Sequence, residues 1–79
     1  MEHKLKRLSW PEGGEIWIAW NWSWMAVPVR SENGTHKEWV IVCLKDNPAK
    51  DMRGGDVMEQ TYKEWYMAKP VLLELIEEQ

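Results

Sequence analysis

The 79-residue chain has a single cysteine, no phenylalanine and no long apolar run. Because Cys43 has no second cysteine to pair with, an intrachain disulfide is excluded, and one free thiol is typical of a reducing cytoplasm. No basic stretch followed by an apolar run opens the sequence, so we expect no signal peptide. The apolar runs are far shorter than a membrane span requires. These absences predict a cytoplasmic protein that does not enter a membrane.

Positive charge is also scarce. Ten Lys and Arg residues stand against thirteen Asp and Glu residues, which gives a net charge of −3 at pH 7. Such a chain lacks the broad positive field that binds a phosphate backbone, and this argues against a nucleic-acid partner. The charge is nevertheless uneven, since residues 3–7 (HKLKR) are basic and residues 74–79 (ELIEEQ) are acidic.

Groups that could bind a metal or perform catalysis are few and scattered. His3, His36 and Cys43 form no close-spaced pair of the kind that zinc sites use. Cys43 lies in an apolar run, where burial makes a thiol inert, and His36 is seven residues away. Glu12 and Glu15 flank a predicted turn, where carboxylates are ordinarily solvated. We therefore expect no enzyme, no metal and no cofactor.

Tryptophan, by contrast, is abundant, with seven residues that supply most of the aromatic surface. Four of them lie in IWIAWNWSWM: Trp17, Trp20, Trp22 and Trp24. Each indole can bury a large area and offers one N–H donor. Three interpretations stay open for this segment: hydrophobic core, an interface with another subunit or protein, and a platform on which a ligand stacks.

The first hairpin is indicated by a Gly-Gly pair at positions 13–14 between two strand-like runs. A two-residue turn at this place puts Arg7 opposite Trp20 and Trp10 opposite Trp17. The second of these would be an aromatic cross-strand pair.

Residues 15–30 alternate between apolar and polar with period two, which favours a strand. The apolar face changes at residues 24–25, so we favour one long strand that bends there. In that strand the last three tryptophans of the segment share one face. A tight turn at residues 21–23, which would give two strands, is the alternative.

A second hairpin is predicted from Asn-Gly at positions 33–34, the strongest short signal for a two-residue turn. It places Trp24 opposite Cys43. The strand over residues 38–44 is almost continuously apolar, which is typical of a strand covered on both faces, by the domain's own helix or by another subunit.

The C-terminal third of the chain shows helical patterns. Asp56 and Glu59 form a capping-box-like start, and the apolar residues that follow have helical spacing. Pro70 should end this helix or begin a new one. Residues 71–78 (VLLELIEE) predict a short amphipathic helix that must dock to be stable.

Together these patterns predict one small α+β domain over residues 1–79. Its fold is an antiparallel meander of three or four strands, with one broken or two short C-terminal helices packed on it. The apolar surface exceeds what one small core uses, so we expect a homodimer or higher assembly.

Candidate residues for binding a ligand or a protein partner are Trp20, Asn21, Trp22, Trp24, Arg30, Trp39 and Arg53. Indoles stack on nucleobases and sugars, while amide and guanidinium groups bind a ligand's polar edge. The loop of residues 50–55 (KDMRGG) is interpreted as a connecting loop, because Asp56 at the predicted helix start would repel an anion; a phosphate site at that helix start is the alternative.

These features favour a protein-binding or inhibitor-type domain without enzymatic activity. By analogy of size and charge, a phage or mobile-element accessory factor that blocks host machinery is one such protein. The alternative is a protein that binds or sequesters a nucleotide-like small ligand in a tryptophan-lined pocket between subunits.

Overall fold

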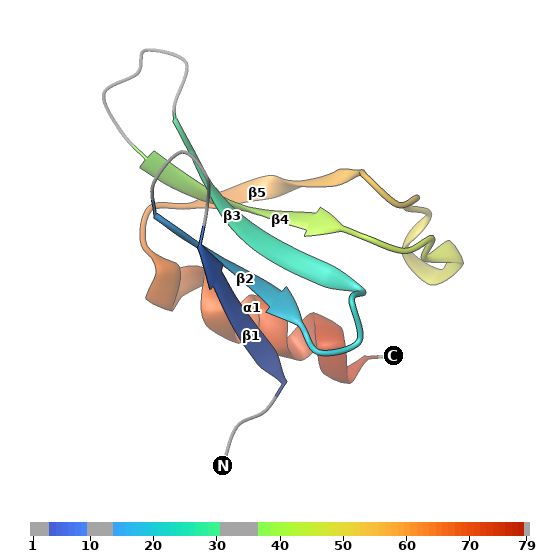
Figure 1. Ribbon diagram of the computed structural model, residues 1–79. Helices are drawn as coiled ribbons and strands as arrows, with labels where there is room; N and C mark the ends of the chain where they lie inside the picture. Colours follow the sequence, from blue (N-terminus) through green and yellow to red (C-terminus); the bar gives the residue numbers. More distant parts are fainter. Residues whose placement is uncertain (1–3, 10–13, 31–36, 79) are drawn as a thin grey trace.

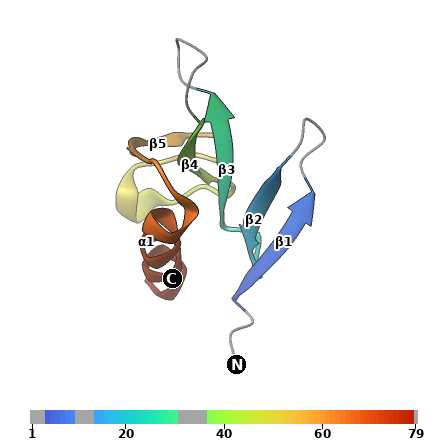
Figure 2. The same cartoon turned by 90° about the vertical axis from the view of Figure 1, so that its left-hand side faces the viewer.

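The computed structural model describes residues 4–9, 14–30 and 37–78. Five strands form one antiparallel sheet in chain order: β1 (Leu5–Ser9), β2 (Glu15–Ala19), β3 (Trp24–Arg30), β4 (Lys37–Cys43) and β5 (Val57–Tyr62). A short 3-10 helix, η1 (Pro48–Lys50), lies between β4 and β5, and the helix α1 (Trp65–Glu77) follows the sheet. The helix lies across one face of the sheet (Figure 1; Figure 2). The α+β class is confirmed; the described residues contain five strands and one α-helix, where we predicted three or four strands with one broken or two short helices.

The pairing of β3 with β4 follows the predicted register. Trp24 lies opposite Cys43, and Ala26 lies opposite Ile41. Both pairs point toward α1 and join the main core. The register is predictable because a two-residue Asn-Gly turn in the sequence fixes which residues of the flanking strands pair.

The predicted register of the first hairpin is wrong. Arg7 lies opposite Trp17 rather than Trp20, and Leu8 lies opposite Ile16. The observed register puts Leu8 and Ile16 in one apolar cluster, so cross-strand burial decides the pairing instead of the Gly-Gly pair. Trp10, which we expected opposite Trp17, lies outside the described residues.

Residues 15–30 form two strands, so the favoured single bent strand is wrong and the alternative turn is correct. The Trp22 N–H donates to the Ala19 carbonyl at 2.9 Å and closes the turn. The Asn21 side chain accepts hydrogen bonds from the backbone N–H and the hydroxyl of Ser23. Such local bonds compete with a strand ladder, which explains why the polar residues between the tryptophans end β2.

The helix predicted from Asp56 is also wrong, because residues 57–62 form β5 on the edge of β4. Asp56 instead closes a turn, in which its carboxylate accepts a hydrogen bond from the Arg53 N–H at 2.9 Å. Met58 and Tyr62 are four residues apart, a spacing that lies on one face of a helix and equally on one face of a strand. Periodicity therefore does not separate the two structures here.

Helix α1 runs through Pro70, where we predicted a break. Proline removes the hydrogen bond that its N–H would donate to the carbonyl of Tyr66. Tyr66 and Pro70 are both exposed, so water can satisfy that carbonyl. The buried side of the helix contains Ala68, Leu72, Leu75 and Ile76, which agrees with the predicted amphipathic pattern over residues 71–78.

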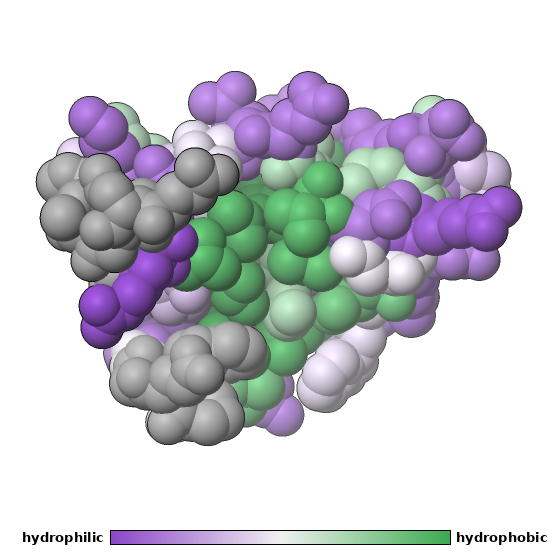
Figure 3. All heavy atoms as spheres, turned by 90° about the horizontal axis from the view of Figure 1, so that it is seen from above, coloured by the Kyte–Doolittle hydropathy of each residue, from purple (hydrophilic) through white to green (hydrophobic). Residues whose placement is uncertain are grey.

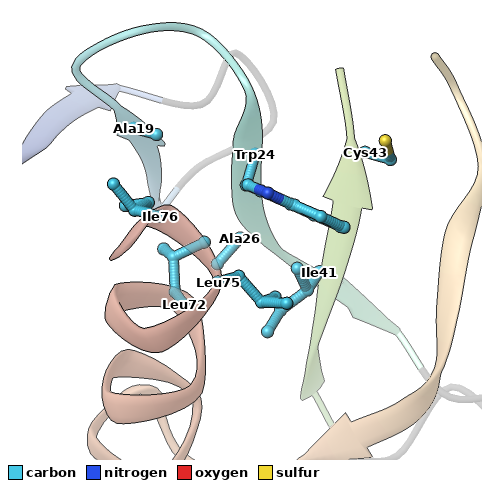
Figure 4. Close-up of a cluster of buried hydrophobic side chains, with 8 residues drawn as sticks. All are labelled: Ala19, Trp24, Ala26, Ile41, Cys43, Leu72, Leu75 and Ile76. Atoms are coloured by element: carbon cyan, nitrogen blue, oxygen red, sulfur yellow. The ribbon is translucent and has the colours of Figure 1, made fainter. Parts of the chain in front are cut away.

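The main core lies between α1 and the sheet. Its buried members are Ala19, Trp24, Ala26, Ile41, Cys43, Leu72, Leu75 and Ile76 (Figure 4). Trp24 is the largest fully buried side chain and fills the space beneath β3 and β4. Burying large apolar groups is the principal stabilising term for a domain of this size.

A second apolar cluster lies on the opposite face of the sheet, which we name the open face. Its buried residues are Ile16, Ile18, Val27 and Val40, with Leu8, Met25, Val42 and Leu44 packed around them. No residue of α1 belongs to this cluster. The sheet thus has apolar side chains on both faces, while the helix covers one of them.

Candidate protein-binding site

The structure separates the tryptophans that we expected on one strand face. Trp24 is fully buried in the main core and is inaccessible to a ligand. Trp39 is half-buried, and its ring centroid lies 5.3 Å from that of Trp65 on α1. These two predicted site residues are therefore part of the packing, which is the core interpretation of the tryptophans.

The two arginines that we predicted in the site, Arg30 and Arg53, do not lie beside the exposed tryptophans. Arg30 ends β3, whereas the turn that carries Trp20 precedes its first residue. Six residues of strand separate the two ends by roughly 20 Å. Arg53 lies in the connection between η1 and β5, where no helix begins, so the helix N-terminus on which the alternative phosphate site depends is absent from this loop.

Three predicted site residues, Trp20, Asn21 and Trp22, do lie together. With Ser23 they form the connection between β2 and β3, which we name the tryptophan turn. Trp20 is 61% exposed and Trp22 is 55% exposed, although both have large apolar side chains. The turn therefore presents two indoles to solvent at a spacing of two residues.

The tryptophan turn is held by backbone bonds to strands on both sides. The Trp20 N–H donates to the carbonyl of Lys4 at 2.8 Å, at the start of β1. The carbonyl of Ser23 accepts from the N–H of Leu44 at 2.9 Å, just after β4. Both contacts are to residues that adjoin strands, so the two exposed indoles are attached to the ends of β1 and β4.

Trp22 has a backbone conformation that is unusual for its residue type. Its φ is +59°, in the left-handed region that glycine and asparagine adopt most readily. A residue held there costs on the order of 1–3 kcal/mol, and such strain persists only where surrounding contacts impose it. The Asn21–Ser23 hydrogen bonds supply such contacts here.

Charged groups adjoin the turn at the C-terminal end of α1. Lys4, whose carbonyl accepts from the turn, forms an ion pair with Glu77. The last turn of α1 contains no basic residue, and Glu78 pairs with Lys50 from η1 at 2.8 Å. The turn therefore lies near the acidic end of the helix.

Among the described residues, pockets lie around η1 and the start of β5. One of about 410 Å³ is lined by residues 46–50 and Glu78, and another of about 560 Å³ by Met52 and residues 56–60. Neither wall contains a tryptophan, so these pockets are separate from the exposed indoles.

The groups considered for catalysis or metal binding are not assembled in the described part of the chain. Cys43 is buried, and its Sγ donates to the carbonyl of Lys45. Within residues 4–9, 14–30 and 37–78, no three His, Cys, Asp or Glu side chains are placed to hold a metal ion. His3 and His36 lie outside this part. No helix among the described residues is long and apolar enough to cross a membrane.

The chain matches no family model, and comparison with curated proteins and with solved structures also gave no match.

The candidate residues named from the sequence include none of the open face. The signal was present, because residues 38–44 are almost continuously apolar and indicate a strand with two covered faces. In the structure α1 covers one face of β4, and Val40 and Val42 lie on the other.

Proposed function

We propose that this protein is a protein-binding domain without catalytic activity, which anchors to its partner through the tryptophan turn. The observation that carries the proposal is the exposure of Trp20 and Trp22. Of the six tryptophans that the structure describes, these two have more than half of their surface exposed. The domain buries Trp24 in its core but leaves Trp20 and Trp22 outside the core.

The energetics of interfaces support this use of the turn. Tryptophan is enriched among residues that dominate binding energy, because a rigid indole buries a large area at a low entropy cost. The backbone bonds of Trp20 and Ser23 fix the turn before a partner arrives. Because the turn is already ordered, binding costs less conformational entropy, and more of the free energy of the contacts contributes to affinity.

The neighbouring charges suggest the chemistry of the partner. Glu77 and Glu78 lie at the end of α1, where they pair with Lys4 and Lys50, and the chain as a whole has a net charge of −3. An apolar pocket with a basic rim would complement indoles beside an acidic helix end. The specific form that we propose is an inhibitor that blocks such a pocket, of the kind by which a phage or mobile-element accessory factor blocks host machinery.

Affinity capture with the full chain tests the proposal. Proteins retained from a bacterial lysate are purified, and their affinities are measured for the wild type, Trp20→Ala, Trp22→Ala and Tyr66→Ala. Tyr66 is a matched control, because it is 69% exposed on α1. We expect each tryptophan variant to weaken binding by about 2 kcal/mol, or about 30-fold, and Tyr66→Ala to leave it unchanged. A partner that binds the tryptophan variants as tightly as the wild type would overturn the proposal.

A nucleotide-like ligand is the second candidate, since exposed indoles also stack on bases. The observation that favours it is the close spacing of Trp20 and Trp22 in one turn. Titration of the intrinsic tryptophan fluorescence with a nucleotide panel tests it. No quenching or spectral shift at millimolar nucleotide would exclude this candidate.

A further inference from the structure

The open face is an apolar surface that the proposed function leaves unused, with a closely packed centre and more exposed margins. Figure 3 shows a continuous apolar surface over the strands, on the side away from α1. At its margins Val29 is 38% exposed and Val57 is 53% exposed. Surfaces of this kind on small soluble proteins mark interaction sites.

We propose that the open face binds a second copy of this chain, with a twofold axis that runs along β3. The two sheets would then pack face to face, with β3 over β3 and β1 of each copy over β5 of the other. Aligned packing of two sheets about 10 Å apart is a common arrangement, and a twofold axis makes the surface complementary to itself.

The charges at the margins of the open face favour a dimer in this orientation. Lys6 lies opposite Ile18 and therefore on the open face of β1. Glu59 lies between Val57 and Thr61 on β5. Val57 lies opposite Val42 and Thr61 lies opposite Val40, both on the open face; the register with β4 shifts between these two pairs, and alternation along β5 itself puts Glu59 on the side of Val57 and Thr61. Among the ion pairs of the described residues, none involves Lys6 or Glu59. One margin thus has an unpaired cation and the opposite margin an unpaired anion.

The strand registers place these two charges at the same level along the sheet. One row of cross-strand partners runs through Lys6, Ile18, Met25, Val42 and Val57. Rotation about an axis along β3 lays this row over its own copy in reverse order. Lys6 then lies over the partner's Val57. The partner's Glu59 is two residues further along the same strand, a distance that a lysine side chain spans.

The other in-plane twofold axis, perpendicular to the strands, is disfavoured by the same charges. It would lay β1 over β1 and β5 over β5, so that Lys6 approaches Lys6 and Glu59 approaches Glu59. Like charges that face each other across an interface weaken it. The open face is therefore complementary to itself in the first orientation only.

The size of the open face sets the expected strength of the dimer. Five strands about 4.8 Å apart, each with about six residues at about 3.3 Å, cover roughly 24 by 20 Å. Two such faces bury on the order of 1,000 Å², near the lower limit for a specific interface. We therefore expect a reversible dimer that dissociates on dilution.

Sedimentation velocity of the full chain from micromolar to millimolar concentration tests the dimer and its orientation. We expect Lys6→Glu and Glu59→Lys each to raise the dimer Kd by about tenfold, because both symmetry-related ion pairs become repulsive. The double variant should dimerise as the wild type does, since the reversed charges again attract. An equimolar mixture of the two single variants should form a heterodimer.

Matched controls are Lys69→Glu and Glu74→Lys, which reverse exposed charges on α1, away from the open face. They should leave the Kd unchanged, and far-ultraviolet circular dichroism should show that every variant is folded. A wild type that is monomeric at millimolar concentration overturns the proposal. Single variants that dimerise as the wild type does, or a double variant that stays weak, overturn the orientation on which it depends.

The dimer and the proposed partner binding can fail separately. Trp20→Ala and Trp22→Ala lie outside the predicted dimer row, so they should leave the dimer Kd unchanged while weakening partner capture. The Lys6 and Glu59 variants should raise the dimer Kd and leave partner capture unchanged.

Discussion

Trp17 of β2 and Trp65 of α1 stack face to face, with ring centroids 4.8 Å apart and ring planes at 7° to each other. Trp39 of β4 meets the same Trp65 ring at 5.3 Å and 46°. Trp65 thus contacts indoles from two strands at the first residue of α1. Aromatic contacts of this kind add to the free energy of area burial, so the group fixes the start of the helix on the sheet.

Trp65→Ala should destabilise the fold by about 3 kcal/mol, because it removes a partly buried indole and both aromatic contacts. Urea unfolding measures this loss. Stacked indoles also produce an exciton couplet in the far-ultraviolet circular dichroism, and the variant should lose it. Trp20→Ala is the control, since this exposed ring has no stacking partner among the described residues. A couplet that survives in Trp65→Ala would show that Trp17 and Trp65 do not stack in solution.

Trp22→Asn should stabilise the fold by about 1 kcal/mol. Asparagine adopts the left-handed backbone conformation of this position more readily than tryptophan does, and little burial is lost at an exposed site. Thermal unfolding monitors the gain. Trp20→Asn is the matched control, because Trp20 is equally exposed but is not among the residues with positive φ.

If Trp22→Asn were less stable than the wild type, the left-handed backbone would not be strained. If it gains stability and loses the partner, Trp22 is retained for binding at the expense of folding.

Lys4→Met should cost no more than about 1 kcal/mol of unfolding free energy at low salt. It removes the ion pair with Glu77, both partners of which are more than a third exposed, and leaves a carboxylate at the negative end of α1. The double variant Lys4→Met/Glu77→Gln should regain most of the loss, because position 77 then no longer carries an unpaired carboxylate.

Urea unfolding at low and at high salt measures both effects of the Lys4–Glu77 pair. The difference between Lys4→Met and the wild type should shrink at high salt, where exposed charges are screened. A loss that is the same at both salt concentrations would assign it to packing of the lysine stem instead.

Some elements were predictable because their signals are local. The β3–β4 register follows from the Asn-Gly turn signal at positions 33–34 of the sequence, which fixes the pairing of the residues on either side of it. The buried side of α1 follows from the spacing of Leu72, Leu75 and Ile76. Both patterns involve residues that are close together in the sequence.

Other elements needed contacts between distant segments. Residues 57–62 have a spacing compatible with a helix or a strand, and the free edge of β4 makes them a strand. The first hairpin has a Gly-Gly turn signal, yet the burial of Leu8 with Ile16 sets its register. In both cases the partner strand decided between two locally acceptable structures.

By itself, the sequence determined that this is a small α+β domain with an excess of indoles, because composition and short-range periodicity are properties of the chain. Only the tertiary structure decided which indoles are core and which are exposed. Trp20, Trp22 and Trp24 are equivalent in the alternation of the sequence, but a turn at Asn21 breaks that alternation. Helix α1 then covers Trp24 and leaves the other two outside, since it packs on one face of the sheet.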